Sequence, residues 1–120
     1  MPTEAKFTPG PWEFGSDHLS DALIVFVRHT ATNQLHLKLV VATIWETAGP
    51  NENEFNARDN AALIASAPDL YEACRQAAQK FRQYEALHEA KGTVEGAQKA
   101  GANAAMAKLC EAALAKAEGR

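Results

Sequence analysis

The sequence predicts an α+β fold in which a three-stranded antiparallel sheet (a meander) is followed by a short helix and a long C-terminal helical hairpin. Residues 1–50 hold both tryptophans and most of the β-branched residues, whereas residues 51–120 are dominated by alanine with Glu, Lys and Gln. Pro68 then divides the second half, because an interior proline removes a helical hydrogen bond and clashes with the preceding turn. Strands followed by helices are typical of an α+β domain.

Length and composition predict one domain over residues 1–120, with a sheet part at 7–50 and a helical part at 51–120. A chain of 120 residues, 47% of them hydrophobic, suffices for one modest core. The net charge of −3 argues against the basic face that a nucleic-acid binder needs. Because no apolar run has the length of a leader or a membrane span, we expect no membrane partner and a cytoplasmic protein.

A short first strand is predicted directly after the segment "TPGPW" at residues 8–12. The two prolines and the glycine of this segment predict a type II turn with positive φ at Gly10. Trp12 and Phe14 follow within the strand. Since tryptophan burial dominates small cores, we interpret the segment as a structural anchor in preference to a binding site.

Residues 22–30 and 35–46 are the other two strands, joined by the polar connection "ATNQ" as an antiparallel hairpin. Both faces of this hairpin are apolar at one end, and a sheet that is apolar on both sides is buried on both sides. We interpret the second face as an interface with a partner or a second subunit, although a long C-terminal helix is an alternative cover. The predicted interface residues are Ile24, Phe26, Val40, Ala42 and Ile44.

Three helices are predicted after the sheet. Asn51 and Glu54 have the spacing of a capping box and begin the first helix. Pro68 then lies in the first turn of the second helix, where proline is tolerated, with Ser66 or Asp69 as its cap. Lys91 and Gly92 end that helix, and Thr93 begins the third.

The second and third helices are predicted to pack against each other as an antiparallel pair. Each carries one apolar stripe at helical spacing, and the small side chains of the third helix permit a close approach. The stripe of the second helix comprises Leu70, Cys74, Ala77, Phe81 and Tyr84. The stripe of the third comprises Ala102, Ala105, Met106, Leu109 and Ala113.

The motifs of common enzymes and metal sites do not occur in the sequence. There is no CxxC pair, HExxH, GxSxG or glycine-rich phosphate loop. Cys74 and Cys110 lie far apart and are expected to be reduced thiols. We therefore predict no catalytic residue, no metal and no cofactor, and we expect the protein not to be an enzyme.

Several basic residues are candidate ligand-binding residues. Arg28, His29 and Arg58 are the best candidates, because they lie at a strand end and near a helix start. A cationic strip on the second helix is a further candidate for a nucleotide, but interspersed glutamates favour an ordinary solvated face. Its members are Arg75, Lys80, Arg82 and Lys91.

Two segments carry a resemblance: "TPGPW" and "NAALIASAPDLYEA" at residues 60–73. Together they resemble a group of small tailed-phage and prophage accessory proteins that open with TPGPW and close with a phrase of the type NARLIAAAPDLLEAL. The sequence departs from that phrase at Ala62, where arginine is frequent, and at Ser66 and Tyr71. The resemblance implies a phage origin and no established activity.

The implied origin and the missing motifs lead to two functional hypotheses. The first is a non-enzymatic phage protein that binds and inhibits a bacterial defence or host protein, as anti-CRISPR proteins do, with a homodimer as an option. The alternative is an oligomeric sponge for a small molecule or nucleotide signal, with a pocket lined by Arg28, His29 or Arg58. An enzyme is the least favoured hypothesis, and a structural component of the phage is a further alternative.

Overall fold

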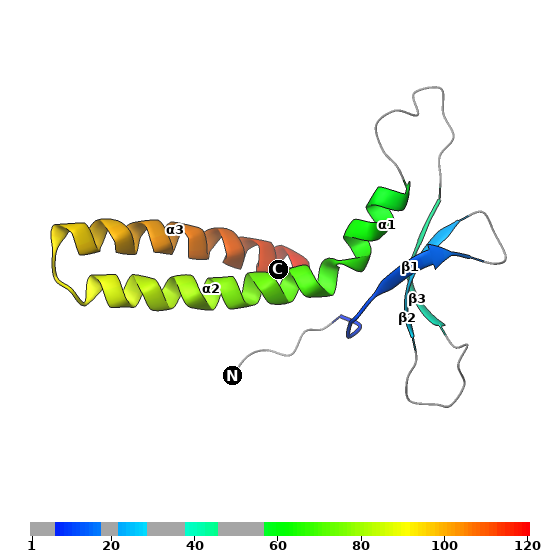
Figure 1. Cartoon of the computed structure of the whole chain (residues 1–120), viewed down its shortest axis with the longest axis horizontal. Coiled ribbons are helices and arrows are strands. Elements are labelled where there is room, and N and C mark those ends of the chain that lie inside the picture. Colours follow the sequence, from blue (N-terminus) through cyan, green and yellow to red (C-terminus); the bar gives the residue numbers. More distant parts are fainter. Residues whose placement is uncertain (1–6, 18–21, 29–37, 46–56) are drawn as a thin grey trace, which may run out of the picture. The chain divides into compact units, whose positions relative to one another are not determined.

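The structure is a computed structural model that describes residues 7–17, 22–28, 38–45 and 57–120 (Figure 1). A three-stranded antiparallel sheet precedes one short and two long helices, which confirms the α+β prediction. The chain divides into two compact units, Met1–Asp69 and Leu70–Arg120. The first helix belongs with the sheet, so the units divide at residue 69, whereas sequence composition changes at residue 50. The prediction of a single domain over 1–120 stays a prediction.

The sheet of the first unit has the order β1-β2-β3 and is a simple meander. Its strands are β1 (Glu13–Ser16), β2 (Leu23–Arg28) and β3 (Lys38–Ile44). All three were predicted, and each neighbouring pair is antiparallel. The described strands are shorter than the predicted 22–30 and 35–46, whose remaining residues include positions outside the described part.

A register shift between β2 and β3 changes which residues share a face. Val25 pairs with Ala42, whereas its neighbour Phe26 pairs with Val40, so that Val41 is an extra residue on β3. Directly paired residues point to the same side of a sheet, and successive residues point to opposite sides. Val40 therefore lies on the face of Phe26, and Ala42 lies on the opposite face. The prediction that Val40, Ala42 and Ile44 lie together on one face is wrong, because a bulge reverses the alternation.

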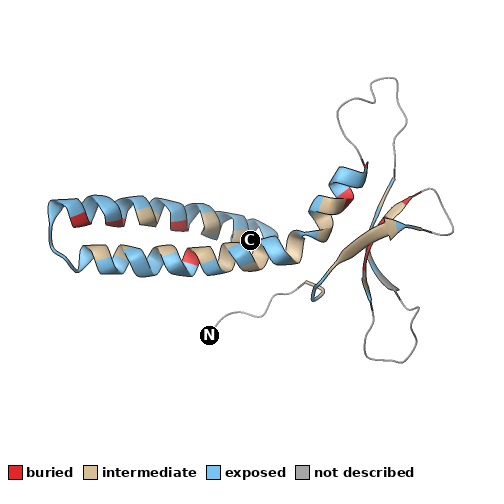
Figure 2. Ribbon diagram, viewed as in Figure 1, coloured by how far each residue is buried: buried red, intermediate tan, exposed pale blue. Residues whose placement is uncertain are grey.

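The core of the first unit is centred on β2 (Figure 2). Three successive residues of this strand, Ile24, Val25 and Phe26, are buried, so both of its faces are covered. Helix α1 (Ala57–Ala65) contacts all three strands, and most extensively β2. It buries Ala57 and Ala61, which lie one turn apart and whose small side chains allow a close approach to the sheet.

The segment "TPGPW" is held by contacts within the first unit. The indole Nε1 of Trp12 donates a hydrogen bond to the carbonyl oxygen of Thr8 at 3.0 Å, and its ring meets Phe7 edge-on at 6.1 Å. Gly10 has no positive φ, so the predicted type II turn is wrong. A Cβ at Gly10 would lie 2.9 Å from Cβ of Pro68. The glycine is therefore needed for a close approach to the start of the next helix.

The two long helices are α2 (Ala67–Glu89) and α3 (Val94–Ala117), which run antiparallel in Figure 1. Pro68 lies in the first turn of α2, as predicted. Ser66 does not cap this helix, because its hydroxyl donates a hydrogen bond to the carbonyl oxygen of Ala62 at 2.8 Å. The predicted capping box of Asn51 and Glu54 lies outside the described residues.

The connection between α2 and α3 follows the prediction. Gly92 adopts a φ of 65°, the left-handed conformation that commonly ends a helix. Thr93 is the N-cap of α3, and its Oγ1 accepts a hydrogen bond from the backbone N–H of Gly96 at 2.9 Å. These two residues fix where α3 begins.

The packed face of α3 differs from the predicted one. The buried residues of α3 are Gly96, Ala100 and Ala107, and α2 contributes Ala78. The five residues predicted to pack, Ala102, Ala105, Met106, Leu109 and Ala113, are all exposed. The reason is that the alanines of α3 are distributed around all sides of the helix, so periodicity alone cannot choose a face. Gly96 lies so close to the end of α2 that a Cβ added to it would be 2.5 Å from the carbonyl oxygen of His88. This contact identifies the face of α3 that packs on α2.

Candidate functional site

Arg28, the first predicted ligand residue, is engaged at the end of β2. Its Nε donates a hydrogen bond to Oε2 of Glu13 on β1 at 2.6 Å. Its guanidinium also lies 6.0 Å from the ring centre of Phe26, two residues earlier on the same face. The charge of Arg28 is thus balanced by Glu13, with both side chains exposed to solvent.

Arg58, the second predicted ligand residue, lies against the opposite face of the sheet. Its guanidinium is 5.6 Å from the ring centre of Phe14. Phe14 pairs with Val25, whereas Phe26 pairs with Glu13, so the rings of Phe14 and Phe26 belong to opposite faces. His29 lies outside the described residues. The structure therefore does not bring Arg28 and Arg58 together at one site.

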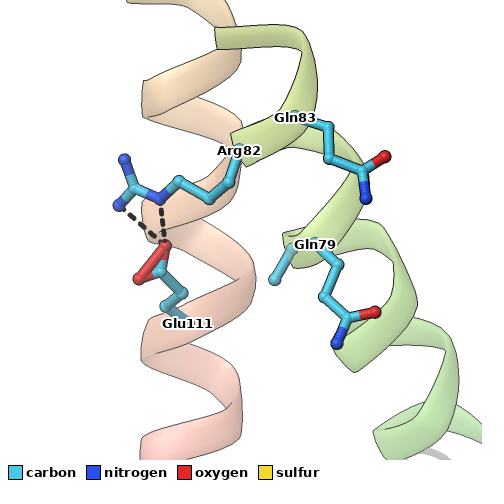
Figure 3. A pocket seen from close by; sticks show the side chains of 5 residues that line it. Gln79, Arg82, Gln83 and Glu111 are labelled. Carbon is cyan, nitrogen blue, oxygen red and sulfur yellow. Dashed lines mark hydrogen bonds and ion pairs between the residues drawn. The ribbon is translucent and has the colours of Figure 1, made fainter. Parts of the chain in front are cut away.

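A shallow hollow of about 560 Å³ lies on the second unit (Figure 3). Its polar lining consists of two glutamines, one arginine and one glutamate from both long helices. Within this lining, Arg82 of α2 is bound to Glu111 of α3 at 2.7 Å, so its charge is not available to an anion. The lining residues are Ala78, Gln79, Arg82, Gln83 and Glu111.

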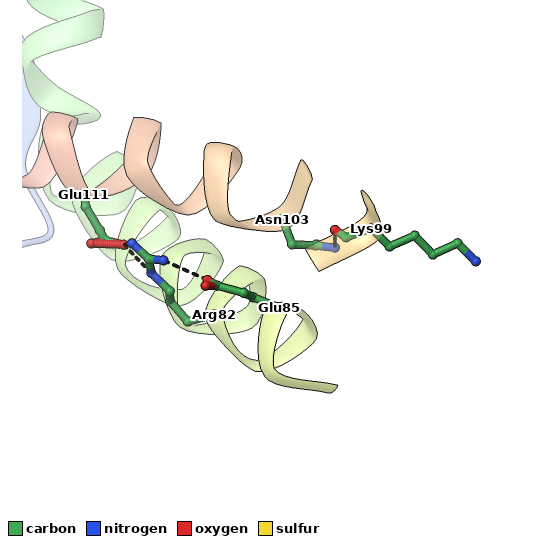
Figure 4. A network of polar contacts seen from close by, with 5 residues as sticks. All are labelled: Arg82, Glu85, Lys99, Asn103 and Glu111. Carbon is green, nitrogen blue, oxygen red and sulfur yellow. Dashed lines mark hydrogen bonds and ion pairs between the residues drawn. The ribbon is translucent and has the colours of Figure 1, made fainter. Parts of the chain in front are cut away.

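The two arginines of α2, Arg75 and Arg82, are paired with glutamates. Arg82 binds both Glu85 and Glu111 at 2.7 Å, which raises the pKa of its guanidinium (Figure 4). Arg75 donates two hydrogen bonds to the carboxylate of Glu72, at 2.6 and 2.8 Å. These bonds, with one from Gln76, lower the pKa of Glu72 to about 2. This pattern is that of a solvated, mixed-charge helix surface.

Groups that commonly carry chemistry are dispersed across the described part of the chain. No three His, Cys, Asp or Glu residues gather there as a metal site would require. Cys74 and Cys110 are free thiols, each half-buried. None of the described helices combines the length and apolar character required to cross a membrane.

Three exposed side chains on and directly after β3 form a candidate binding surface of the first unit. Val40 is 48% exposed and Trp45, directly after the strand, is 64% exposed. Thr43 lies between them and is also exposed. We call these three residues the β3 surface. In the order β1-β2-β3 this strand is terminal, so one of its backbone edges is paired with no described strand.

The predicted interface residues are distributed over both faces of the sheet. Ile24 and Phe26 are 7% and 4% exposed, so they belong to the core of the chain itself. Ala42 and Ile44 are half-buried on the opposite face. Val40 is the exposed member of the set, while Trp45 is exposed although it was not among the predicted interface residues. The interface itself stays a prediction.

Comparison with known proteins relates the chain to a protein family. No curated protein and no solved structure matches the chain. A family model described as Salmonella phage P22 protein Y8K6 matches residues 1–120, the whole chain. This match supports the phage kinship that the two motifs indicated over a much smaller part of the sequence. The chain belongs to the family of Salmonella phage P22 protein Y8K6.

Proposed function

We propose that this chain is a non-enzymatic phage accessory protein that binds a bacterial host or defence protein in the cytoplasm and inhibits it by direct contact. The observation that carries the proposal is the β3 surface, where Trp45 is 64% exposed and Val40, five residues earlier, is 48% exposed. Membership of a phage protein family supports a target of bacterial origin.

The exposure of Trp45 indicates a binding surface because tryptophan contributes strongly to the binding energy of protein interfaces. Trp, Tyr and Arg are enriched among the few residues that supply most of the binding energy of protein interfaces. A tryptophan whose ring is left in water loses the stabilisation that burial would give, so the exposed position of Trp45 directly after β3 favours contact with another protein.

The surroundings of the β3 surface also suit a protein partner. Arg28 and Glu13 form an exposed ion pair on the face that carries Val40. Interfaces commonly combine an apolar centre with a polar rim of this kind. The edge of β3 that pairs with no described strand adds a second mode of recognition, since a partner strand can extend the sheet by main-chain hydrogen bonds.

Affinity capture from phage-sensitive bacteria tests the proposal. The bait proteins are the wild-type chain, Trp45→Ala and the control Leu63→Ala, which removes an equally exposed leucine from α1 (63%). We expect wild type and Leu63→Ala to retain the same bacterial protein and Trp45→Ala to lose it. The purified partner should then bind wild type with a Kd at least about tenfold lower than that of Trp45→Ala. Equal binding by all three baits would contradict the proposal.

A further inference from the structure

We propose that the outward face of α3 associates with the same face of a second copy of the chain, with the two α3 helices antiparallel. This face consists of Ala102, Met106, Leu109 and Ala113, which recur at intervals of four and three residues. The association uses the second unit and is independent of the β3 surface.

The exposure of large apolar residues first indicates a missing partner. Met106 is 44% exposed and Leu109 is 66% exposed, although both lie in the middle of a helix of 24 residues. The side of α3 that packs within the chain is marked by Gly96, Ala100 and Ala107. A helix that is apolar on its packed side and again on its outward side is typical of one buried between two neighbours.

The second unit buries little apolar volume by itself. Within the described residues 70–120, the buried residues are Ala78, Gly96, Ala100 and Ala107, none larger than alanine. Units of this size commonly need additional stabilisation, and oligomerisation is one source of it. A second copy packed on α3 would bury Met106 and Leu109 and thereby supply larger apolar side chains to the core.

The outward face of α3 is complementary to itself, which favours a second copy of the chain as the partner. The charges at the two ends of the face favour an antiparallel arrangement. An antiparallel copy centred between residues 105 and 106 brings Leu109 near the partner's Ala102, so a large residue meets a small one. The same arrangement brings Glu95, at one end of the face, near the partner's Lys116, at the other end. Parallel helices would instead place like charges together. Glu95 forms only an exposed pair with Lys99, at 3.1 Å, and so remains accessible to a partner.

Light scattering on the full chain tests the association. We expect wild type to have twice the mass of the 13.0 kDa chain. Leu109→Glu should raise the dimer dissociation constant at least about tenfold, because it places a charge in the contact of each copy. Leu87→Glu, at an equally exposed leucine of α2 (61%), is the matched control and should remain dimeric. A monomeric wild type, or equal dissociation of both variants, would overturn the proposal.

Oxidative cross-linking tests the direction. In a Cys74→Ser and Cys110→Ser background, Met106→Cys lies close to the two-fold axis and should form a disulfide-linked dimer. Ala113→Cys should not, because its partner copy would lie about 22 Å along the helix axis, far beyond disulfide reach. Circular dichroism establishes that both variants keep wild-type helicity. Cross-linking at both positions would show a parallel pair, and cross-linking at neither would show that this face is not shared by two copies; either result overturns the proposal.

Discussion

Val40 lies directly across from Phe26 on neighbouring strands, yet Phe26 is 4% exposed and Val40 is 48% exposed. One face of the sheet is therefore covered over its central strand and open over its terminal strand. This difference separates residues that stabilise the fold from residues that are free to bind, and the proposed function depends on that separation.

Substitution at these two paired positions should have unequal effects on stability. Phe26→Ala removes a buried ring and should reduce the free energy of unfolding by about 3–5 kcal/mol. Val40→Ala changes an exposed side chain and should cost less than about 1 kcal/mol. Urea denaturation followed by tryptophan fluorescence measures both. Equal losses would mean that Val40 is as well covered as Phe26.

Two glycines of α3 should respond oppositely to alanine. A Cβ at Gly96 would lie 2.5 Å from the carbonyl oxygen of His88 and 2.9 Å from Oγ1 of Thr93, so Gly96→Ala should destabilise the hairpin by about 1–3 kcal/mol. Nothing lies within 4 Å of a Cβ at Gly101, and Gly101→Ala should stabilise it by about 0.5–1 kcal/mol. Thermal unfolding followed by circular dichroism checks the signs. A gain at both positions would contradict the packing of α3 on α2.

The Glu72 carboxyl should titrate well below its ordinary range. Hydrogen bonds from Arg75 and Gln76 lower its pKa from 4.5 to about 2. Because the folded-state pKa is the lower one, the pair stabilises the folded state above pH 4.5, and this contribution is lost as the pH falls towards 2. Carbon-13 NMR of the side-chain carboxyl follows the titration. Arg75→Gln should return the pKa towards 4.5, and an unchanged value in this variant would show that Arg75 is not the cause.

Nucleotides should not stabilise the protein through Arg28 and Arg58 jointly. The two guanidiniums lie over rings on opposite faces of the sheet, and Arg28 is paired with Glu13. A thermal-shift screen with cyclic dinucleotides, cyclic oligonucleotides and NAD derivatives should therefore give no concentration-dependent rise in Tm. A rise that Arg28→Ala and Arg58→Ala each abolish would support the sponge hypothesis instead.

The sequence predicted the order and type of the elements because local chemistry determines them. Pro68 lies in the first turn of one helix, Gly92 follows the end of that helix and Thr93 caps the next, each through its own backbone or side-chain geometry. The strands were recognisable from their β-branched and apolar residues. These features act over a few residues, so they can be read without knowledge of the tertiary structure.

The faces that the elements present were less predictable. The extra residue at Val41 reverses the alternation of β3, and neither of its neighbours signals it. In α3, an alanine-rich sequence offers several equivalent stripes, and only the contact of Gly96 with the end of α2 selects one. Gly10 was predicted to serve a positive φ, but it serves a close approach to Pro68, a residue far away in the sequence. The exposure of Trp45 depends on such long-range packing and was missed for the same reason.

Phage plating on defended bacteria tests the central claim most directly. A sensitive phage is plated on strains that each carry one defence system and express wild type, Trp45→Ala or Leu63→Ala at equal levels. The proposed function predicts that wild type and Leu63→Ala restore plating on at least one strain, while Trp45→Ala does not. Restored plating by Trp45→Ala to the wild-type level would contradict the role of the β3 surface, and unchanged plating on every strain would contradict inhibition of a defence protein.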